Sequence, residues 1–275
     1  MNNPMRSQSI LLPGIVAFAL SVAGCGSGSS SDSGTSSTGT VASPAGIWSG
    51  TDSQSGLALT GFINSAGQAD FIRADGVQYV GTAQVSGSSL DIALDGYTQF
   101  GAEFSDGSTA GVGTLSATFS ANNTIAGTLG FTTSANTATS STWSLTFDSL
   151  YDTASSLGTI SGGYTEPQPA VTGGSDPMQG ASITITGLGQ ITGQGGTSGC
   201  VLSGTVTAGN LSYDLYEVSY ELSECTGTYA VLNDVPFTGL GEINRGTSST
   251  QVLFAVTGKS SAGTYYSLVS ALTAG

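Results

Sequence analysis

From residue 43 to the end of the chain, apolar residues mostly occupy every second position, and clusters of Gly, Asn, Asp and Ser interrupt this pattern. Such alternation indicates strands with one buried face, and many short strands in succession are typical of antiparallel barrels and sandwiches. No stretch of ten or more residues in this region follows the period of a helix. The sequence therefore predicts an all-β protein with an antiparallel, barrel-like or sandwich architecture. The clearest alternating runs are 57–63, 90–94, 115–119, 125–131, 143–147, 183–185 and 252–256.

One run changes the face that it buries. Between Asn210 and Cys225, apolar side chains occupy odd positions up to Leu215 and even positions from Tyr216 onward. A shift of one residue moves every following side chain to the other face of a sheet. We therefore expect a β-bulge or a strand bend at Leu215 and Tyr216.

A weak internal repeat divides the folded region. Residues 45–51 align with 157–163, and the stretch that begins at Val80 aligns with the stretch that begins at Ser203. The two units would each contain roughly 110 residues, a usual size for a single β domain. The alternative is one continuous barrel.

The repeat predicts a first β domain at 44–156 and a second at 157–275. The strongest break in the pattern is 166–180, which contains three prolines. This segment is either the linker between the domains or a long loop after the first strand of the second domain. We favour the loop, because the repeat places the boundary near residue 157.

The first 24 residues have the three parts of an export signal: a polar start with Arg6, an apolar run from Ile10 to Leu20, and a small-residue exit. An N-terminal anchor or a buried helix is the alternative, but a run of this length is too short to span a bilayer, which takes about 20 residues. Val22-Ala23-Gly24-Cys25 resembles the lipobox of bacterial lipoproteins. The resemblance implies cleavage before Cys25 and acylation of its thiol and new amino group, with palmitate as a typical acyl chain. Gly26, where Asp would signal retention at the inner membrane, implies the outer membrane of a Gram-negative bacterium.

Residues 25–43 would form the lipidated cysteine and a tether, since Gly, Ser and Thr dominate this segment and such chains behave as flexible coils. After cleavage the chain would carry 18 acids against three bases, Arg73, Arg245 and Lys259. This balance opposes binding to nucleic acid and to anionic lipid, because both rely on clustered Lys and Arg. The predicted membrane contact is therefore the lipid at Cys25.

Gly46-Ile47-Trp48 resembles the Gly-x-Trp motif in the first strand of lipocalins and other calycins. The resemblance implies a barrel that holds a small apolar ligand. The alternative interpretation is a tryptophan that fills the core at the end of a sheet, because aromatic side chains commonly fill β cores.

Cys200 and Cys225 remain as an even pair after Cys25 is lipidated. In an oxidising compartment they are expected to form a disulfide between neighbouring strands. The chain has no Cys-x-x-Cys motif and no histidine, so we predict no redox site, no metal site and no cofactor.

The absence of histidine also excludes Ser-His-Asp and Cys-His catalysis. Two acid pairs have the spacing for a glycosidase, Asp148 with Asp152 and Glu217 with Glu221, but both fit solvent-exposed strand faces or loop ends better. The remaining acidic motifs are predicted as turns, and none has the ligand spacing of a calcium loop. These motifs are Asp75-Gly76, Asp95-Gly96 and Asp106-Gly107. Incidental Ca²⁺ binding by these acidic loops is the alternative, because carboxylate oxygens suit this ion.

The expected function is a non-enzymatic lipoprotein that displays β domains at the bacterial envelope and binds a protein, a glycan or a small molecule. The alternatives are a structural or assembly component that faces the periplasm, a carboxylate-based glycan hydrolase, and a lipocalin-like carrier. The sequence favours neither the periplasmic nor the cell-surface side of the outer membrane.

Overall fold

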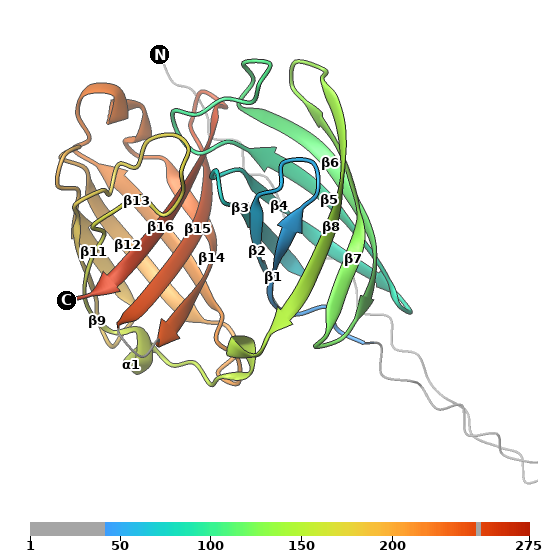
Figure 1. The fold of residues 1–275 in the computed structure, drawn as a ribbon. Helices are drawn as coiled ribbons and strands as arrows, with labels where there is room; N and C mark the ends of the chain where they lie inside the picture. The colour runs from blue at the N-terminus through green and yellow to red at the C-terminus, as the bar shows by residue number, and fades with distance from the viewer. Residues whose placement is uncertain (1–41, 246–248) are drawn as a thin grey trace, which may run out of the picture. The chain divides into compact units, whose positions relative to one another are not determined.

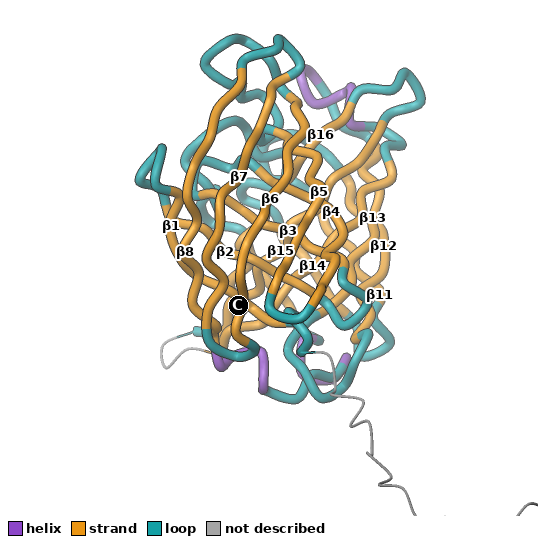
Figure 2. The backbone as a smooth tube through the Cα atoms, turned by 90° about the vertical axis from the view of Figure 1, so that its right-hand side faces the viewer, coloured by secondary structure: helices purple, strands orange, loops and turns teal. Residues whose placement is uncertain are grey.

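The computed structural model describes residues 42–245 and 249–275, which belong to one compact unit. The predicted leader 1–24, the predicted lipidation site Cys25 and nearly all of the predicted tether 25–43 lie outside the described residues. The described chain forms two closed antiparallel barrels of eight strands each (Figures 1 and 2). The prediction of an all-β, barrel-like protein with two successive β units is confirmed.

In each barrel every strand pairs with the next one along the chain, and the last strand closes the barrel by pairing with the first. The strands of the first barrel are β1 (Gly46–Asp52), β2 (Ala58–Ile63), β3 (Gln68–Arg73), β4 (Gln78–Ser86), β5 (Ser89–Tyr97), β6 (Ala110–Ser120), β7 (Thr124–Thr133) and β8 (Ala138–Asp148). Those of the second barrel are β9 (Gly162–Thr165), β10 (Ser182–Ile185), β11 (Gln190–Gln194), β12 (Val201–Ala208), β13 (Tyr216–Ser223), β14 (Pro236–Arg245), β15 (Thr250–Lys259) and β16 (Tyr265–Ala274).

Three short helical turns complete the described elements: η1 (Ser149–Asp152), α1 (Leu157–Ile160) and η2 (Gly227–Leu232). None of the helices in the described part of the chain is both long and apolar enough to cross a bilayer.

The alignment of the internal repeat is correct for the stretches that begin at Val80 and Ser203. It is displaced for the segments 45–51 and 157–163. Val80 lies in β4 and Ser203 lies in β12, and each is the fourth strand of its barrel. Residues 157–160, by contrast, form α1 instead of a strand, because the Ser156 hydroxyl accepts a hydrogen bond from the Thr159 N–H and caps a helical turn. The first strand of the second barrel therefore begins at Gly162. The loop predicted at 166–180 lies between β9 and β10, directly after that first strand.

The bulge predicted at Leu215 and Tyr216 is wrong. Residues 209–215 form the loop between β12 and β13, and β13 begins at Tyr216. Leu211 in this loop is 64% exposed, so its place in an alternating run was coincidental. The parity changes because the chain enters a new strand there.

Large aromatic side chains fill the interior of the first barrel. Trp48, Phe71 and Trp143 are fully buried, and the Trp143 ring lies 5.2 Å from that of Phe71 and 5.3 Å from that of Tyr79, between ring centroids. Strand glycines make room for these rings. A Cβ atom on Gly96 would collide with the ring of Phe131. The turn predicted at Asp95-Gly96 is therefore wrong, because Gly96 continues β5 and leaves space for an aromatic neighbour.

The outer faces of the two barrels pack together. Gln78 on β4 is fully buried, and its Nε2 donates to Ser267 Oγ at 2.6 Å and to the Leu268 carbonyl at 2.9 Å on β16. The apolar part of this contact is one cluster that draws residues from both barrels. It includes Ile47, Phe62 and Ile72 of the first barrel and Leu240, Ala255 and Val269 of the second.

The edge of β16 that faces β9 is only partly paired, because β9 is short and pairs with β16 only at Thr273 and Ala274. Side chains satisfy the backbone further along this edge. Gln99 Oε1 accepts from the Val269 N–H at 3.1 Å, and Glu166 Oε1 accepts from the Ala271 N–H at 2.8 Å. A glutamine of the first barrel therefore helps to complete the edge of the second.

Candidate functional site

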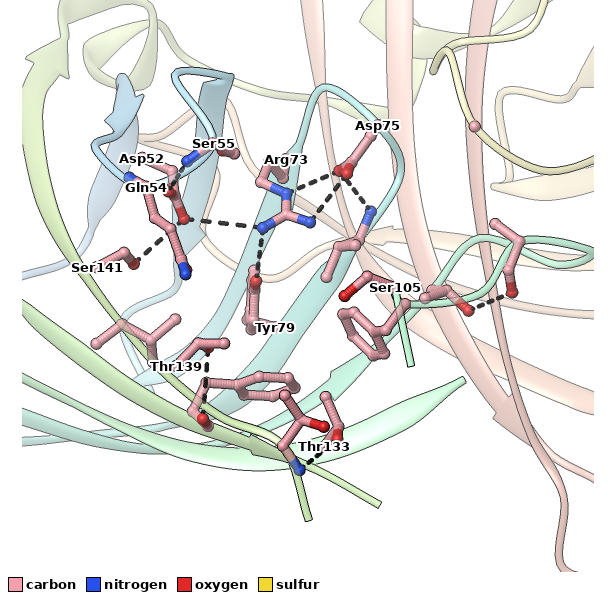
Figure 3. A pocket seen from close by; sticks show the side chains of 18 of the residues that line it. Asp52, Gln54, Ser55, Arg73, Asp75, Tyr79, Ser105, Thr133, Thr139 and Ser141 are labelled. Carbon is pink, nitrogen blue, oxygen red and sulfur yellow. Dashed lines mark hydrogen bonds and ion pairs between the residues drawn. The ribbon is translucent and has the colours of Figure 1, made fainter. Parts of the chain in front are cut away.

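A cavity of about 410 Å³ occupies the end of the first barrel at which β1, β3, β5 and β7 finish (Figure 3). We call this cavity the cup. It is surrounded by the loops 53–57, 74–77, 98–109 and 134–137, and Gly173 from the long loop of the second barrel adds to its wall. The side chains that matter most for its chemistry are Asp52, Arg73, Asp75, Tyr79, Phe104 and Phe131.

Arg73 is the cationic centre of the cup. It is the last residue of β3 and faces inward, in the same alternation as Phe71. Its Nε and Nη2 donate to the two carboxylate oxygens of Asp75 at 2.8 and 2.9 Å, which is the bidentate geometry of a strong pair (Figure 3). Its Nη1 donates to the Tyr79 hydroxyl at 3.3 Å and lies 3.9 Å from Asp52 Oδ2.

Asp52, the last residue of β1, is buried and its oxygens are well partnered. Oδ1 accepts from the backbone N–H groups of Gln54 and Ser55, both at 2.9 Å. Oδ2 accepts from the Ser141 hydroxyl at 3.2 Å and from the Trp143 indole N–H at 3.3 Å. Asp52 therefore connects the wall of the cup to the aromatic core below it.

The ionisation of the cup follows from these contacts. Burial would raise the pKa of Asp52, but the hydrogen bonds from Ser55 and Trp143 and the charge of Arg73 outweigh burial and lower that pKa. Burial likewise opposes the charge of Arg73, yet the hydrogen bond to Asp75 and the nearby charges raise its pKa. Burial raises the pKa of Tyr79 to about 12, so its hydroxyl keeps its proton at neutral pH.

The loop 98–109 shapes the rim of the cup. Asp106 accepts from the N–H and the hydroxyl of Ser108, at 3.0 and 2.6 Å, and from the Thr133 hydroxyl at the end of β7. These hydrogen bonds, first that of the Ser108 hydroxyl, hold the pKa of Asp106 far below its ordinary value. The loop also carries Phe104, whose ring centroid lies 5.5 Å from that of Phe131. An aromatic pair is thereby fixed beside the polar centre.

The long loop of the second barrel braces this rim. The Thr172 N–H donates to the Ala74 carbonyl at 3.1 Å, and the Ser175 N–H donates to the Phe100 carbonyl at 2.6 Å. Both acceptors belong to loops that surround the cup. The cup is therefore shaped by both halves of the chain.

The lining of the cup offers groups that can recognise a polar ligand. Its fixed groups include hydroxyls, carboxylate oxygens, a guanidinium and aromatic faces, which offer both donors and acceptors. Asp52, Asp75 and Glu103 outnumber the single cation Arg73, so the local charge disfavours an anionic ligand. Within the described ranges, no group of three or more His, Cys, Asp or Glu is arranged to hold a metal ion.

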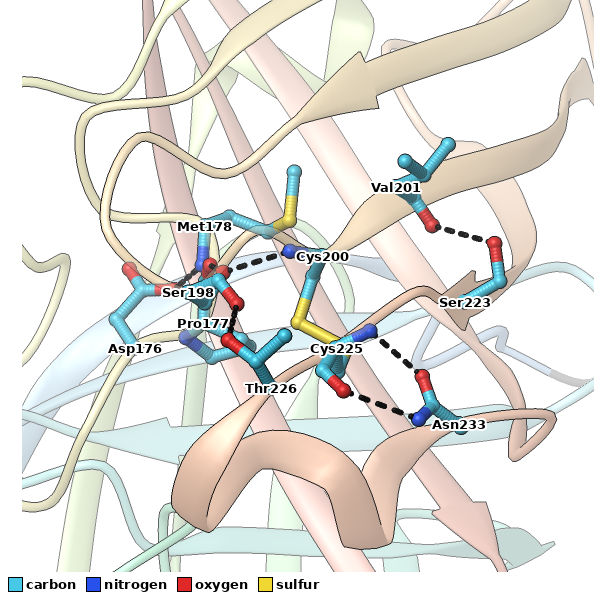
Figure 4. Close-up of a disulfide and its surroundings, with 10 residues drawn as sticks. All are labelled: Asp176, Pro177, Met178, Ser198, Cys200, Val201, Ser223, Cys225, Thr226 and Asn233. Carbon is cyan, nitrogen blue, oxygen red and sulfur yellow. Dashed lines mark hydrogen bonds between the residues drawn. A yellow bond between two sulfur atoms is a disulfide. The ribbon is translucent and has the colours of Figure 1, made fainter.

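The predicted disulfide lies in the second barrel, away from the cup. Cys200 and Cys225 are bonded; Cys200 directly precedes β12, and Cys225 follows the end of β13 by two residues (Figure 4). These two strands are neighbours, as the sequence predicted. The Asn233 side chain accepts from the Cys225 N–H at 2.8 Å and donates to the Cys225 carbonyl at 3.2 Å, so the following loop is fastened to the bridge.

The other acids singled out in the sequence lie elsewhere. Asp148 accepts from the Leu150 N–H at 2.9 Å and caps η1, which contains Asp152. Glu217 and Glu221 are exposed on the outer face of β13. Asp75-Gly76 and Asp106-Gly107 lie in turns with a positive φ at the glycine, as predicted.

Several buried acids were not anticipated by sequence reasoning. Burial, and then the charge of Asp176, raises the pKa of Glu166 to about 9, and burial raises the pKa of Asp176 as well. Burial also raises the pKa of Asp214 to about 6 and that of Glu242 to about 7. These acids follow no motif, because long-range packing buries them.

Arg73 was also missed as a site residue, although the sequence contains a signal for it. It is one of four basic residues in the chain, and its odd position continues the inward face of Phe71. A scarce cation at the inward end of a strand, two residues before an aspartate, indicates a buried ion pair. The comparisons with known proteins add no assignment, because no family model and no curated protein sequence matches this chain.

Proposed function

We propose that this protein is a non-enzymatic lipoprotein of the bacterial outer membrane that binds a neutral glycan in the cup of its first barrel. The observation that carries the proposal is the composition of the cup. A guanidinium held between two carboxylates stands beside an aromatic pair and several hydroxyls in a cavity of about 410 Å³. Cavities of this size and mixed lining are typical small-molecule sites.

A neutral, hydroxyl-rich ligand fits this lining better than other classes do. Sugar hydroxyls both donate and accept hydrogen bonds, as the fixed ion pair and the wall hydroxyls require. A purely apolar ligand would remove Arg73 and Asp75 from water without replacing their hydrogen bonds, which costs free energy. The aromatic interior of the first barrel also opposes a lipocalin-like carrier, because Trp48, Phe71 and Trp143 already fill that space.

The non-enzymatic assignment rests on how the carboxylates are used. Asp75 is paired bidentately with Arg73, and Asp52 accepts four hydrogen bonds while its pKa is lowered. A glycosidase needs one carboxyl group that stays protonated to act as an acid. Asp52, whose pKa is lowered, is not suited to that role, and both carboxylate oxygens of Asp75 accept hydrogen bonds from Arg73.

The direction of the chain supports a tethered receptor. Residue 43 precedes β1 at the end of the barrel opposite the cup, because β1 starts at Gly46 and reaches the cup at Asp52. The tether to a lipid on Cys25 would therefore join the first barrel at the end opposite the cup.

Glycan binding is tested with the purified full-length protein on an array of neutral mono- and oligosaccharides from the gluco-, galacto-, manno- and N-acetylglucosamine series. We expect saturable binding to at least one series. Thr139→Val should weaken it about 2- to 10-fold, the value of one hydrogen bond, because Thr139 lines the cup and its hydroxyl makes only a 3.5 Å contact with the Phe131 carbonyl.

The matched control is Thr142→Val, since Thr142 lies on the same strand but is exposed on the outer face. Equal effects of the two substitutions would argue against the cup as the binding site. No binding to any neutral glycan would contradict the proposed ligand and favour the structural role in the envelope.

The membrane attachment has its own test. Cys25→Ala should move the protein from the membrane fraction to the soluble fraction or block its processing. Unchanged processing and membrane retention would refute the lipid anchor. Protease treatment of intact cells then reports whether the cup faces the outside.

A further inference from the structure

A second cavity, of about 220 Å³, adjoins the cup on the other side of the rim loop. We call it the groove. One wall is formed by residues 98–103 of the first barrel, and the other by Thr264, Tyr265 and Tyr266 of the second. Thr98, Ala102 and Glu103 line both the groove and the cup. The two cavities therefore share one wall.

The groove has a rigid base. Gln99 and Ser267 form an isolated parallel bridge, and the Phe100 N–H donates to the Ser267 carbonyl at 3.0 Å. Gln99 Oε1 also accepts from the Val269 N–H at 3.1 Å. The rim loop is thus joined to β16 through its backbone, so both walls of the groove are held in place.

Aromatic rings line the groove in fixed positions. Tyr265 is 42% exposed, and its ring stacks on that of Tyr97 with centroids 4.8 Å apart and planes 14° apart. Lys259 Nζ lies 4.6 Å from the centroid of the same ring. Tyr266 packs beside Phe100 at 5.9 Å between centroids. Binding to rings that are already oriented loses little conformational entropy.

The chemistry of the groove matches that of the cup. Among its described lining residues, Glu103 is the only charged one, and the rest are threonines, aromatic residues and small or neutral residues. The neighbouring cation Lys259 is not one of these lining residues, and its Nζ lies over the Tyr265 ring, so a phosphate or sulfate group would meet the carboxylate of Glu103 without a cation in the lining to balance it. An extended peptide would need a free strand edge to pair with, but Gln99 and Phe100 already occupy this part of the edge of β16.

We propose that the groove is a second sugar subsite and that the natural ligand is the end of a neutral oligosaccharide. The terminal unit would occupy the cup, and the next unit would cross the shared wall at Glu103 and lie against Tyr265. This inference rests on the proposed glycan-binding function and specifies its ligand as a chain rather than a free monosaccharide.

The test is isothermal titration of the full-length protein with a monosaccharide, its disaccharide and its trisaccharide from each of the four neutral series. We expect affinity to rise at least tenfold from monosaccharide to disaccharide in the recognised series. Tyr265→Ala should abolish that rise and leave monosaccharide affinity unchanged, because Tyr265 lies outside the cup. The loss of its stacking on Tyr97 should lower the melting temperature only slightly. Tyr265→Phe, which keeps the ring, should retain most of the rise.

The outcomes distinguish the second subsite from the proposed binding of glycan in the cup. Monosaccharide and disaccharide binding with equal affinity would overturn the second subsite and leave the glycan-binding cup intact. A rise in affinity that survives Tyr265→Ala would also overturn it. Failure of every sugar to bind would overturn both proposals together.

Discussion

The two barrels have the same strand order but differ at the same end. In the first barrel this end is open and holds the cup. In the second, the loop 166–181 folds over the corresponding end, where Met178 is 1% exposed and belongs to the hydrophobic core of that barrel (Figure 4). The Ser198 hydroxyl, also buried, donates to the Pro177 carbonyl and holds the loop down.

The loops, and not the sheets, make one barrel open and the other covered at this end. The connection after the first strand is 53–57 in the first barrel and 166–181 in the second. The longer connection closes its own barrel and also braces the rim of the neighbouring cup through Thr172 and Ser175. The comparison shows how one repeated fold can supply an open cavity in one copy and a support for its rim in the other.

Removing the disulfide is expected to produce the largest difference in stability between the two barrels. Replacing both Cys200 and Cys225 with serine should destabilise the second barrel by about 3 kcal/mol, because the bridge closes a loop of 25 residues in the unfolded chain. Hydrogen exchange read by mass spectrometry should show faster exchange in β11–β14 and unchanged exchange in β5–β8. Equal loss of protection in both barrels would contradict the prediction that the disulfide stabilises only the second barrel.

Gly96 tests the packing that forms the cup. Gly96→Ala should cost about 1–3 kcal/mol, because the new methyl group would overpack against the Phe131 ring. It should also weaken glycan binding, since Phe131 lines the cup. Denaturant unfolding and the glycan titration measure the two effects.

The control for Gly96 is Gly130→Ala on β7. This glycine adjoins Phe131 in sequence, yet a methyl group there would meet nothing within 4 Å. The substitution should leave both stability and binding close to those of the natural protein. A loss equal to that of Gly96→Ala would mean that ring displacement is not the cause.

The acids of the cup and its rim predict a response to pH opposite to that of the buried acids of the second barrel. In the second barrel the pKa values of Asp214, Glu242 and Glu166 are raised, to about 6, 7 and 9, mainly by burial. Unfolding releases their protons between pH 4 and these values, so the free energy of unfolding should fall as pH rises, by up to about 1.4 kcal/mol per pH unit for each group.

In the cup and its rim loop, the pKa values of Asp52 and Asp106 are lowered, so their contribution is present above the ordinary aspartate pKa and is lost as pH falls below it. Denaturant unfolding between pH 3 and pH 9 measures both trends. Glu166→Gln should remove part of the decline above pH 7, whereas Glu221→Gln, on an exposed face, should not. A stability that rises between pH 5 and pH 9 would contradict the assignment of the buried acids.

The sequence predicted the strands and the disulfide well because both depend on local signals. Alternation placed most inward residues correctly, and only two cysteines follow the predicted lipidation site. Prediction from the sequence failed where contacts between residues distant in the chain decide the local structure. Gly96 looked like part of a turn, but it serves the distant Phe131, and Leu211 looked like part of a strand but lies in a loop.

The cup itself was beyond sequence reasoning for a similar reason. Asp52, Arg73 and Ser141 lie on three different strands, and only closure of the barrel brings them together. No short motif records that closure. Glu166 and Gln99 likewise acquire their roles only because β9 is too short to complete the edge of β16.

The two tryptophans of the chain allow the most direct test of the cup. The Trp143 indole N–H donates to Asp52 beneath the cup, and the Trp48 indole N–H donates to the Pro44 carbonyl at the opposite end of the same barrel. The measurement is a titration of ¹⁵N-labelled protein with the neutral oligosaccharides of the array, followed through the two indole signals by NMR. We predict that a bound sugar shifts the Trp143 signal saturably and leaves the Trp48 signal in place. Shifts of Trp48 alone, or no shift of Trp143 at saturation, would contradict the claim that the cup is the binding site.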